Sequence, residues 1–294
     1  MSAPSLATCP WCARAVPAAA LACPSCGAPA GASTHADEAG WVSLPGARDM
    51  AELTVGTAGC QISGTTVPVA DFRLAQNDTV YFSHHVLLWK DPTVQVRAQS
   101  LKGAWKRLFA GLPLVMTEAH GPGHIAFSKD HPGEMIAVPL NAGQAIDVRE
   151  HVFVVATGSV TYDWFQTGIW FQTRQGDDTE THYPIGMFMD RFTAGPQPGL
   201  LMLHGAGNLF VRTLAAGETI LLKPNALLYK SPEVSMHLVI EQVSTSTGGL
   251  FGWASPWQRY FWLRLRGPGR VAIQSADKHH HETVHQVVSA SPSA

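Results

Sequence analysis

Apolar and polar residues alternate in short segments through the middle of this chain. Residues 80–84 (VYFSH) and 146–150 (IDVRE) place apolar side chains at every second position, which predicts β-strands with one buried face. Continuous apolar runs follow them at residues 86–89 (VLLW) and 152–155 (VFVV). These runs predict strands that are buried on both faces.

The same pattern occurs three times. Residues 71–96 align without a gap on residues 137–162, 66 positions later, and residues 212–234 align again after a further 74 positions. The shared apolar positions are Leu74, Leu140 and Leu214; Val80, Ile146 and Ile220; and Val94, Val160 and Val234. Three copies of one unit predict internal pseudo-symmetry, because a single copy cannot bury its apolar face alone. We expect the copies to close around one common hydrophobic interior.

Glycine and proline mark the boundaries between these strands. The tripeptide Gly-Pro-Gly stands at residues 121–123 before HIAFS and at residues 267–269 before RVAIQS. Both predict tight turns in which a glycine adopts a positive φ. The one helical candidate is residues 101–109 (LKGAWKRLF), between the first and second copies.

The bulk composition is that of a folded domain. Of 294 residues, 46% are hydrophobic and 14% charged, which supplies ample material for a core. The net charge of -2 does not favour a general electrostatic grip on nucleic acid or an anionic membrane. No apolar stretch reaches the ~18 residues of a membrane helix. The N-terminus lacks the basic start of a signal peptide, so we expect a cytoplasmic protein.

We divide the chain into four parts. Residues 1–27 contain two CxxC pairs, and residues 28–40 (APAGASTHADEAG) are small and polar, as in a flexible linker. Residues 41–276 form the β-repeat domain. Residues 277–294 (DKHHHETVHQVVSASPSA) are a polar, histidine-containing tail that we expect to be disordered.

The two CxxC pairs carry the clearest chemical signal. Cys9 and Cys12 are separated by ten residues from Cys23 and Cys26. Two such pairs can place four thiolates around one tetrahedral Zn²⁺, and a site with four sulfurs and no open position is structural. The segment is too small for a core of its own, so metal binding would supply its folding energy. The sequence therefore predicts an N-terminal zinc ribbon. Cys60 lies outside it and is expected to be a small buried residue.

Several phrases resemble one known family. The Gly-Pro-Gly turns before β segments, the LxxGExI pattern from Leu214 to Ile220, and the phrase GNLFVRTLAAGETILLKPNALLYKSPEV are similar to the altered inheritance of mitochondria twenty-four family. The resemblance covers residues 50–276. It implies an all-β, double-stranded β-helix-like fold, similar to the trp RNA-binding attenuation protein, with three pseudo-repeats and a tendency to trimerise. It also implies a link to the organisation of the mitochondrial inner membrane, and it supplies no catalytic residues.

Histidine offers a second candidate site. His85 and His151 hold the same position in copies one and two, and Asn225 holds it in copy three. Around a pseudo-threefold axis these three could converge on a metal, because histidine is the commonest transition-metal ligand. They also lie on the polar face, opposite the apolar positions, which is typical of surface or turn residues. His120 and His124 flank a turn rather than lying on a helix, so their spacing does not favour chelation.

Three other clusters have a structural and a functional interpretation. Arg259, Arg264, Arg266 and Arg270 lie among aromatic residues, as in a binder of single-stranded nucleic acid or in an ordinary outer strand. The aromatic stretch at residues 164–171 (WFQTGIWF) suits a core, a subunit interface or a membrane-surface contact. The acidic segment at residues 176–182 lacks the oxygen spacing of a calcium loop and reads as a solvated loop.

The repeated patterns serve folding, and the polar residues form no acid–base or nucleophile constellation. The leading hypothesis is a non-enzymatic β domain that assembles as a homotrimer, acts as a scaffold for an unknown protein partner and has a possible peripheral contact with a membrane. One alternative is a metal-dependent or small-molecule-binding β-barrel enzyme that uses His85, His151 and Asn225. A second is a nucleic-acid-binding protein, which the negative net charge disfavours.

Overall fold

The computed structural model describes residues 6–9, 15–18, 20, 23, 36–44, 49–55, 58–98, 116–243, 258–276 and 287–292. In these residues the regular structure consists of β-strands and two single-turn 3₁₀ helices, η1 (His84–Val86) and η2 (Pro224–Ala226). The prediction of an all-β fold is confirmed. The helix expected at residues 101–109 lies outside the described residues, as do residues 277–286 of the tail.

Most strands fall into three successive groups of six, which we call units 1, 2 and 3. Unit 1 contains β6 (Val69–Leu74), β7 (Thr79–Ser83), β8 (Leu87–Lys90), β9 (Gln95–Ala98), β10 (Met116–His120) and β11 (Gly123–Phe127). Unit 2 contains β12 (Glu134–Leu140), β13 (Ala145–Arg149), β14 (Phe153–Thr157), β15 (Val160–Gln166), β18 (Phe188–Ala194) and β19 (Gly199–Gly205). Unit 3 contains β20 (Leu209–Leu214), β21 (Thr219–Leu222), β22 (Leu227–Lys230), β23 (Ser235–Val243), β24 (Gln258–Arg266) and β25 (Gly269–Gln274).

The remaining strands lie at the margins of these units. They are β1 (Leu6–Thr8), β2 (Ala15–Pro17), β3 (Val42–Leu44), β4 (Ala51–Val55), β5 (Ala58–Ser63), β16 (Phe171–Gln175), β17 (Asp178–His182) and β26 (Val287–Ala290). The β4–β5 hairpin extends unit 1 beside β6, and β3 extends unit 3 beside β20. The β16–β17 hairpin interrupts unit 2 and pairs with β26.

All three units have the same antiparallel pairing. The fifth strand of each unit pairs with its second and fourth strands, and the sixth pairs with its first and third. The second strands begin at Thr79, Ala145 and Thr219, and the third strands begin at Leu87, Phe153 and Leu227. These starts are 66 and then 74 residues apart, the spacings of the sequence alignment.

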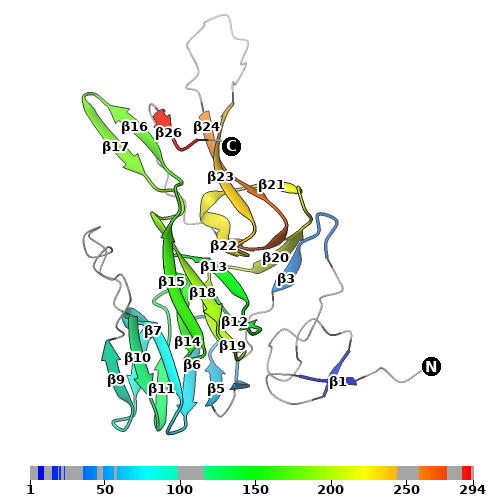
Figure 1. Ribbon diagram of the computed structural model, residues 1–294, viewed down its shortest axis with the longest axis vertical. Coiled ribbons are helices and arrows are strands. Elements are labelled where there is room, and N and C mark those ends of the chain that lie inside the picture. Colours follow the sequence, from blue (N-terminus) through cyan, green and yellow to red (C-terminus); the bar gives the residue numbers. More distant parts are fainter. Residues whose placement is uncertain are drawn as a thin grey trace, which may run out of the picture.

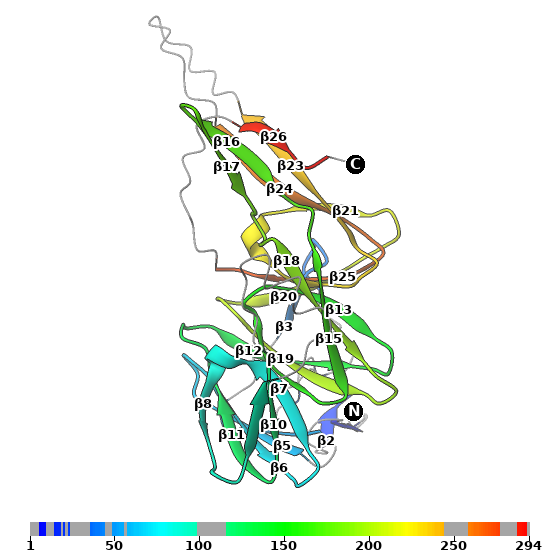
Figure 2. The ribbon, with the colours of Figure 1, turned by 60° about the vertical axis from the view of Figure 1, so that its left-hand side comes forward.

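The units are joined in a row. The second strand of unit 1, β7, pairs with the third strand of unit 2, β14. In the same way β13 of unit 2 pairs with β22 of unit 3. Figures 1 and 2 show unit 1 (cyan), unit 2 (green) and unit 3 (yellow to orange) following one another along the long axis of the molecule.

The expectation of one common interior was wrong. The buried apolar residues of the described chain form three clusters instead of one. The first lies in unit 1 and includes Val154 and Val155 of unit 2, and the second lies mainly in unit 2 with Tyr81 and Leu228 from its neighbours. The third fills unit 3. The physical reason is that strand pairing runs from one unit to the next, so each interior is closed by its neighbour.

The two Gly-Pro-Gly turns are present as predicted. Gly123 and Gly269 have φ values of 133° and 134°, which L side chains rarely adopt. A side chain on Gly121 would collide with the backbone carbonyl of Ala75, and one on Gly267 with that of Ala215. Because these glycines have no side chain, the turn between the fifth and sixth strands can pack closely against the connection between the first and second strands.

Candidate functional site

A cleft of about 390 Å³ lies where unit 2 approaches unit 3. Its walls come from the turn after β13, the segment between β17 and β18, the end of β19, and η2. The polar residues that line it include His131, Arg149, Glu150, His151, His204 and Asn225. Most of these polar residues belong to turns or to η2, which connect the strands.

His204 is the most unusual residue of the cleft. Its side chain is 2% exposed, yet neither ring nitrogen has a hydrogen-bond partner. The ring packs edge-on against His131, with 4.8 Å between the ring centroids. Burial, reinforced by the nearby charges of His131 and Lys129, lowers the pKa of His204 to about 4. His204 is therefore neutral at pH 7, with one nitrogen able to donate and the other to accept.

Lys129 connects the turns of units 1 and 2. Its ammonium group donates to the backbone carbonyl of His151 at 2.8 Å and to Nε2 of His85 at 3.5 Å. The residue is only 6% exposed, and burial lowers its pKa to about 8. His151 has a φ of 68°, a left-handed conformation that is uncommon outside glycine. Burial and then the charge of Lys129 lower the pKa of His151.

The three positions singled out in the sequence lie on three successive turns. His85 belongs to η1, His151 to the turn before β14, and Asn225 to η2. Lys129 joins the first two, and Arg149 donates to the carbonyl of Asn225 at 2.6 Å. Lys129 and Arg149 donate to the backbone carbonyls of His151 and Asn225, so these hydrogen bonds stabilise the turns and leave the two side chains out of the contact. Within the described ranges, no three His, Cys, Asp or Glu side chains are placed to hold a metal ion.

The predicted zinc ligands are described in part. Cys9 follows β1 and is 2% exposed, and Cys23 is fully buried. Both belong to the first apolar cluster, together with Val16. Cys12 and Cys26 lie outside the described residues, so the zinc site stays a prediction. Thiolates brought together in apolar surroundings are the donor set that Zn²⁺ prefers.

Cys60 is 3% exposed, which agrees with its expected role as a small buried residue. Burial, together with the negative charge of Asp71, raises the pKa of its thiol far above the usual range. It is therefore a protonated thiol at neutral pH, and such a thiol is a poor nucleophile.

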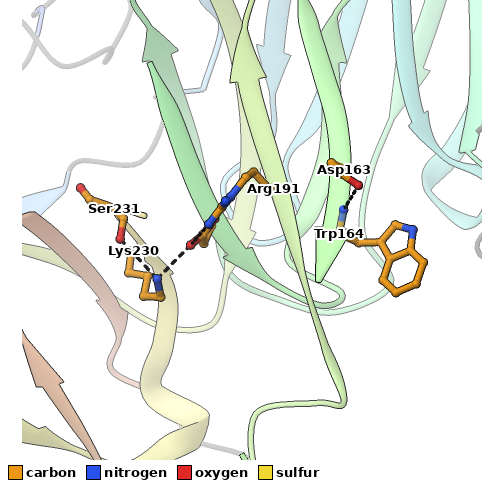
Figure 3. A network of polar contacts seen from close by, with 6 residues as sticks. Asp163, Trp164, Arg191, Lys230 and Ser231 are labelled. Atoms are coloured by element: carbon orange, nitrogen blue, oxygen red, sulfur yellow. Dashed lines mark hydrogen bonds and ion pairs between the residues drawn. The ribbon is translucent and has the colours of Figure 1, made fainter. Parts of the chain in front are cut away.

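A buried ion network at the unit 2–unit 3 junction was not predicted. Asp147 is fully buried, and its carboxylate accepts hydrogen bonds from Arg191 at 2.6 and 3.0 Å and from Lys230 at 2.8 Å. Figure 3 shows the Arg191 and Lys230 side chains pointing toward one another from β18 and β22, the two strands that flank β13. The bond to Asp147 raises the pKa of Arg191. Arg191 also lies over the ring of Phe165, 4.9 Å from its centroid.

The alternation of residues 146–150 placed Asp147 on a solvent face, and that interpretation was wrong. The reason is that Asp147 has a charged partner on each neighbouring strand: Lys230 lies directly opposite it on β22 and Arg191 on β18. A signal was available in the sequence. Lys230 is a charged residue at the end of a strand that is otherwise apolar (LLY), and such a lysine needs an acidic partner when it is buried.

The other sequence candidates have structural roles in the described chain. Leu263 and Leu265 are fully buried while Arg264 and Arg266 alternate with them on β24, as expected for an outer strand. Phe171 stacks on Phe261, with 4.1 Å between centroids, so part of the aromatic stretch packs in the core.

The remaining polar candidates do not form a common site either. His120 contacts Thr79 at 3.1 Å, whereas His124 contacts Asp71 at 3.2 Å, so these two histidines have separate partners. The acidic segment is not a loop throughout: residues 176 and 177 form the exposed turn of the β16–β17 hairpin, and residues 178–182 form β17.

The fold and the site define a class: an all-β repeat protein in which the conspicuous buried polar groups brace turns and strand junctions. The family described as Mitochondrial biogenesis AIM24 matches residues 60–276, and the chain belongs to this family. The comparison with curated proteins gave no match.

Among solved structures, the chain is similar to protein SPYM3_0169 from Streptococcus pyogenes. The two share 18% sequence identity over 75% of this chain and 94% of that one, with a TM-score of 0.53. This likeness shows a shared fold. No helix in the described residues is long and apolar enough to cross a membrane.

Proposed function

We propose that this protein is a non-catalytic scaffold that assembles with copies of itself and presents its surfaces to a protein partner. The observation that carries the proposal is the repeated junction: β7 with β14 and β13 with β22 join the units through equivalent strands. Because each unit pairs with a strand edge of the next unit, a second copy of the chain could be added through the same kind of strand pairing. The family description, mitochondrial biogenesis, is in keeping with an organising role, and the proposal includes a peripheral contact with a membrane.

The zinc ribbon extends this scaffold. Cys9, Cys12, Cys23 and Cys26 would hold one structural Zn²⁺ and order the N-terminal segment. The ion would supply folding energy and no catalytic step, because four thiolates leave no open coordination position.

Light scattering coupled to size-exclusion chromatography tests the assembly. We expect the full chain to elute as an oligomer, with a trimer as the specific expectation, and its mass to fall on dilution. Pull-down from a native lysate with the same full chain then identifies the protein partner. A strictly monomeric protein at every concentration would contradict the scaffold.

One observation favours a second candidate function, the binding of a small polar molecule. His204 is buried with both ring nitrogens unpartnered and lies in the wall of the cleft, where a ligand could use both. An enzyme that acts on such a ligand would use His151, Asn225 and His204 of the cleft, with His85 beside Lys129.

Isothermal calorimetry with a panel of small carboxylic acids, phosphates and sugars tests this alternative. Binding by the full chain that is lost in His204→Leu would support it. The absence of heat with the whole panel would count against it.

A further inference from the structure

The row of units ends in two strand edges that match each other. At one end β8, the third strand of unit 1, pairs only with β11 in the described chain. At the other end β21, the second strand of unit 3, pairs only with β24. Within the chain, second strands pair with third strands of the next unit. We propose that a second copy of this chain supplies the missing partner, so that β21 of one copy pairs antiparallel with β8 of the next. This inference rests on the proposed self-assembly and specifies its interface.

The two internal junctions have the same register. At the first, Phe82 lies opposite Val155 and Tyr81 opposite Ala156. At the second, Val148 lies opposite Tyr229 and Asp147 opposite Lys230. Adding 66 to the unit 1 residue numbers and 74 to the unit 2 residue numbers of the first junction gives the residue numbers of the second junction. One register, used twice, therefore predicts the third junction: Leu222 opposite Trp89, and Leu221 opposite Lys90.

The exposure of the edge residues supports this assignment. Leu88 is 57% exposed, whereas its counterparts Val154 and Leu228 are fully buried. Trp89 is 44% exposed, against 0% for Val155 and 6% for Tyr229. The expectation that residues 86–89 form a strand buried on both faces therefore fails within a single chain, and pairing with a second copy would restore it.

The opposite edge shows the same contrast. Leu221 is 51% exposed, whereas its counterparts Tyr81 and Asp147 are 2% and 0% exposed. Both edges thus present large apolar side chains at positions that the internal junctions bury. A strand edge with unpaired backbone groups and apolar side chains is a template for pairing with another chain.

The proposed contact is head to tail, because β8 and β21 are different surfaces at opposite ends of the row. Figure 2 shows β8 in the lower half of the molecule and β21 in the upper half. A contact of this kind closes into a ring when the rotation between copies permits, and otherwise continues as a filament. Each chain carries one edge of each type, so every copy in a ring would make two identical junctions.

Introducing a negative charge at each edge tests the inference against a matched control. Trp89→Glu disables the β8 edge, Leu221→Glu disables the β21 edge, and Met50→Glu changes a residue that is 63% exposed away from both. We expect each edge variant to be monomeric by light scattering at a concentration at which the parent chain and Met50→Glu are oligomeric. Circular dichroism confirms that each variant is folded.

Mixing the two edge variants distinguishes head-to-tail pairing from other contacts. Each retains one intact edge, so a one-to-one mixture should form heterodimers although neither variant associates alone. A mixture that remains monomeric, while the parent chain assembles, would overturn the β8–β21 junction.

Cysteine cross-linking tests the register directly. In the double variant Lys90→Cys with Leu221→Cys, the new thiols should face each other across the junction with Cβ atoms ~5 Å apart, near the range of a disulfide. Oxidation should give covalent oligomers on a non-reducing gel. The control, Lys90→Cys with Leu222→Cys, places the second thiol on the other face of the strand and should give none.

The outcomes separate the inference from the proposed function. Assembly of the parent chain without cross-linking, or with edge variants that still assemble, would overturn the β8–β21 junction and leave the scaffold standing. A parent chain that never assembles would overturn both.

Discussion

The ammonium nitrogen of Lys230 lies 2.8 Å from a carboxylate oxygen of Asp147, and the two residues are direct partners across the junction of β22 and β13. Lys230 is 5% exposed and Asp147 fully buried. Arg191, the opposite neighbour of Asp147 on β18, completes a row of charges across three strands. A buried carboxylate held by two cations makes this junction specific, because any shift in register would separate the charges.

Removing the charge of Asp147 should weaken the fold. Asp147→Asn leaves Lys230 buried without its anionic partner, and we expect the free energy of unfolding to fall by about 3–5 kcal/mol. Asp178→Asn, on the exposed β16–β17 hairpin, should change it by less than ~0.5 kcal/mol. Denaturant titration followed by circular dichroism measures both. Equal stabilities of Asp147→Asn and Asp178→Asn would show that the network does not stabilise the junction.

His204 should make stability depend on pH in the acidic range. Its pKa is lowered from the ordinary 6.5 to about 4, so the unfolded chain binds a proton more readily than the folded chain. The free energy of unfolding should therefore fall as the pH drops from about 6.5 to about 4, by on the order of 1 kcal/mol per pH unit. Thermal unfolding of the parent chain and of His204→Leu across this range measures the effect.

In His204→Leu the slope should be smaller, and stability at pH 7 should not decrease, because neither ring nitrogen makes a hydrogen bond that would be lost. His131→Gln removes the neighbouring ring, whose charge also lowers the pKa of His204, so its slope should lie between those of the parent chain and His204→Leu. An unchanged slope in His204→Leu would assign the acid sensitivity to other groups.

The Gly-Pro-Gly turn should not tolerate a side chain at its first position. In Gly121→Ala the new methyl group would meet the carbonyl of Ala75, and we expect a loss of about 1–3 kcal/mol through overpacking. Gly59→Ala, where the nearest atoms belong to the flexible end of the Arg73 side chain, 3.3 Å from the added carbon, should be tolerated with little change. Chemical denaturation of the two variants side by side provides the comparison. Similar losses at both positions would mean that the turn can relax around the methyl group.

The four cysteines of the N-terminal segment should bind one zinc ion per chain. Elemental analysis of the purified full chain should find stoichiometric zinc that is lost in Cys12→Ser and in Cys26→Ser, because removing one thiolate opens the tetrahedral site. Cys60→Ala should keep its zinc. Zinc retained in full by both serine variants would refute the zinc ribbon and direct attention to the histidines.

Local sequence reasoning succeeded where the relevant neighbours are close in the chain. Arg264 and Arg266 were interpreted as residues of an ordinary strand, and Leu263 and Leu265, which alternate with them, are buried; the two Gly-Pro-Gly turns were found where glycine is required. It failed where a distant strand decides the environment. Asp147 is paired with Lys230 of β22, 83 residues away in the chain, and Leu88 is exposed because β8 has no second neighbour among the described strands.

The cleft could be predicted only in part. His85, His151 and Asn225 were recognised as equivalent, but Lys129 and His204, which give the region its electrostatic character, lie on the segments that follow β11 and on β19. Neither lies in one of the three aligned segments. Lys129 and His204 are buried because two units pack together around them, and the periodicity of the sequence does not predict this packing.

The amino-acid sequence by itself determined the strands, the turns between them and the spacing of the three units, since these depend on the two-residue period of side chains and on the backbone freedom of glycine. The tertiary structure alone decided which units touch. It placed second strands against third strands in a row, buried Asp147 with its two cations, and left β8 and β21 at opposite ends. Hydrogen bonds between strands far apart in the chain select these neighbours, and such bonds leave no local pattern to be read.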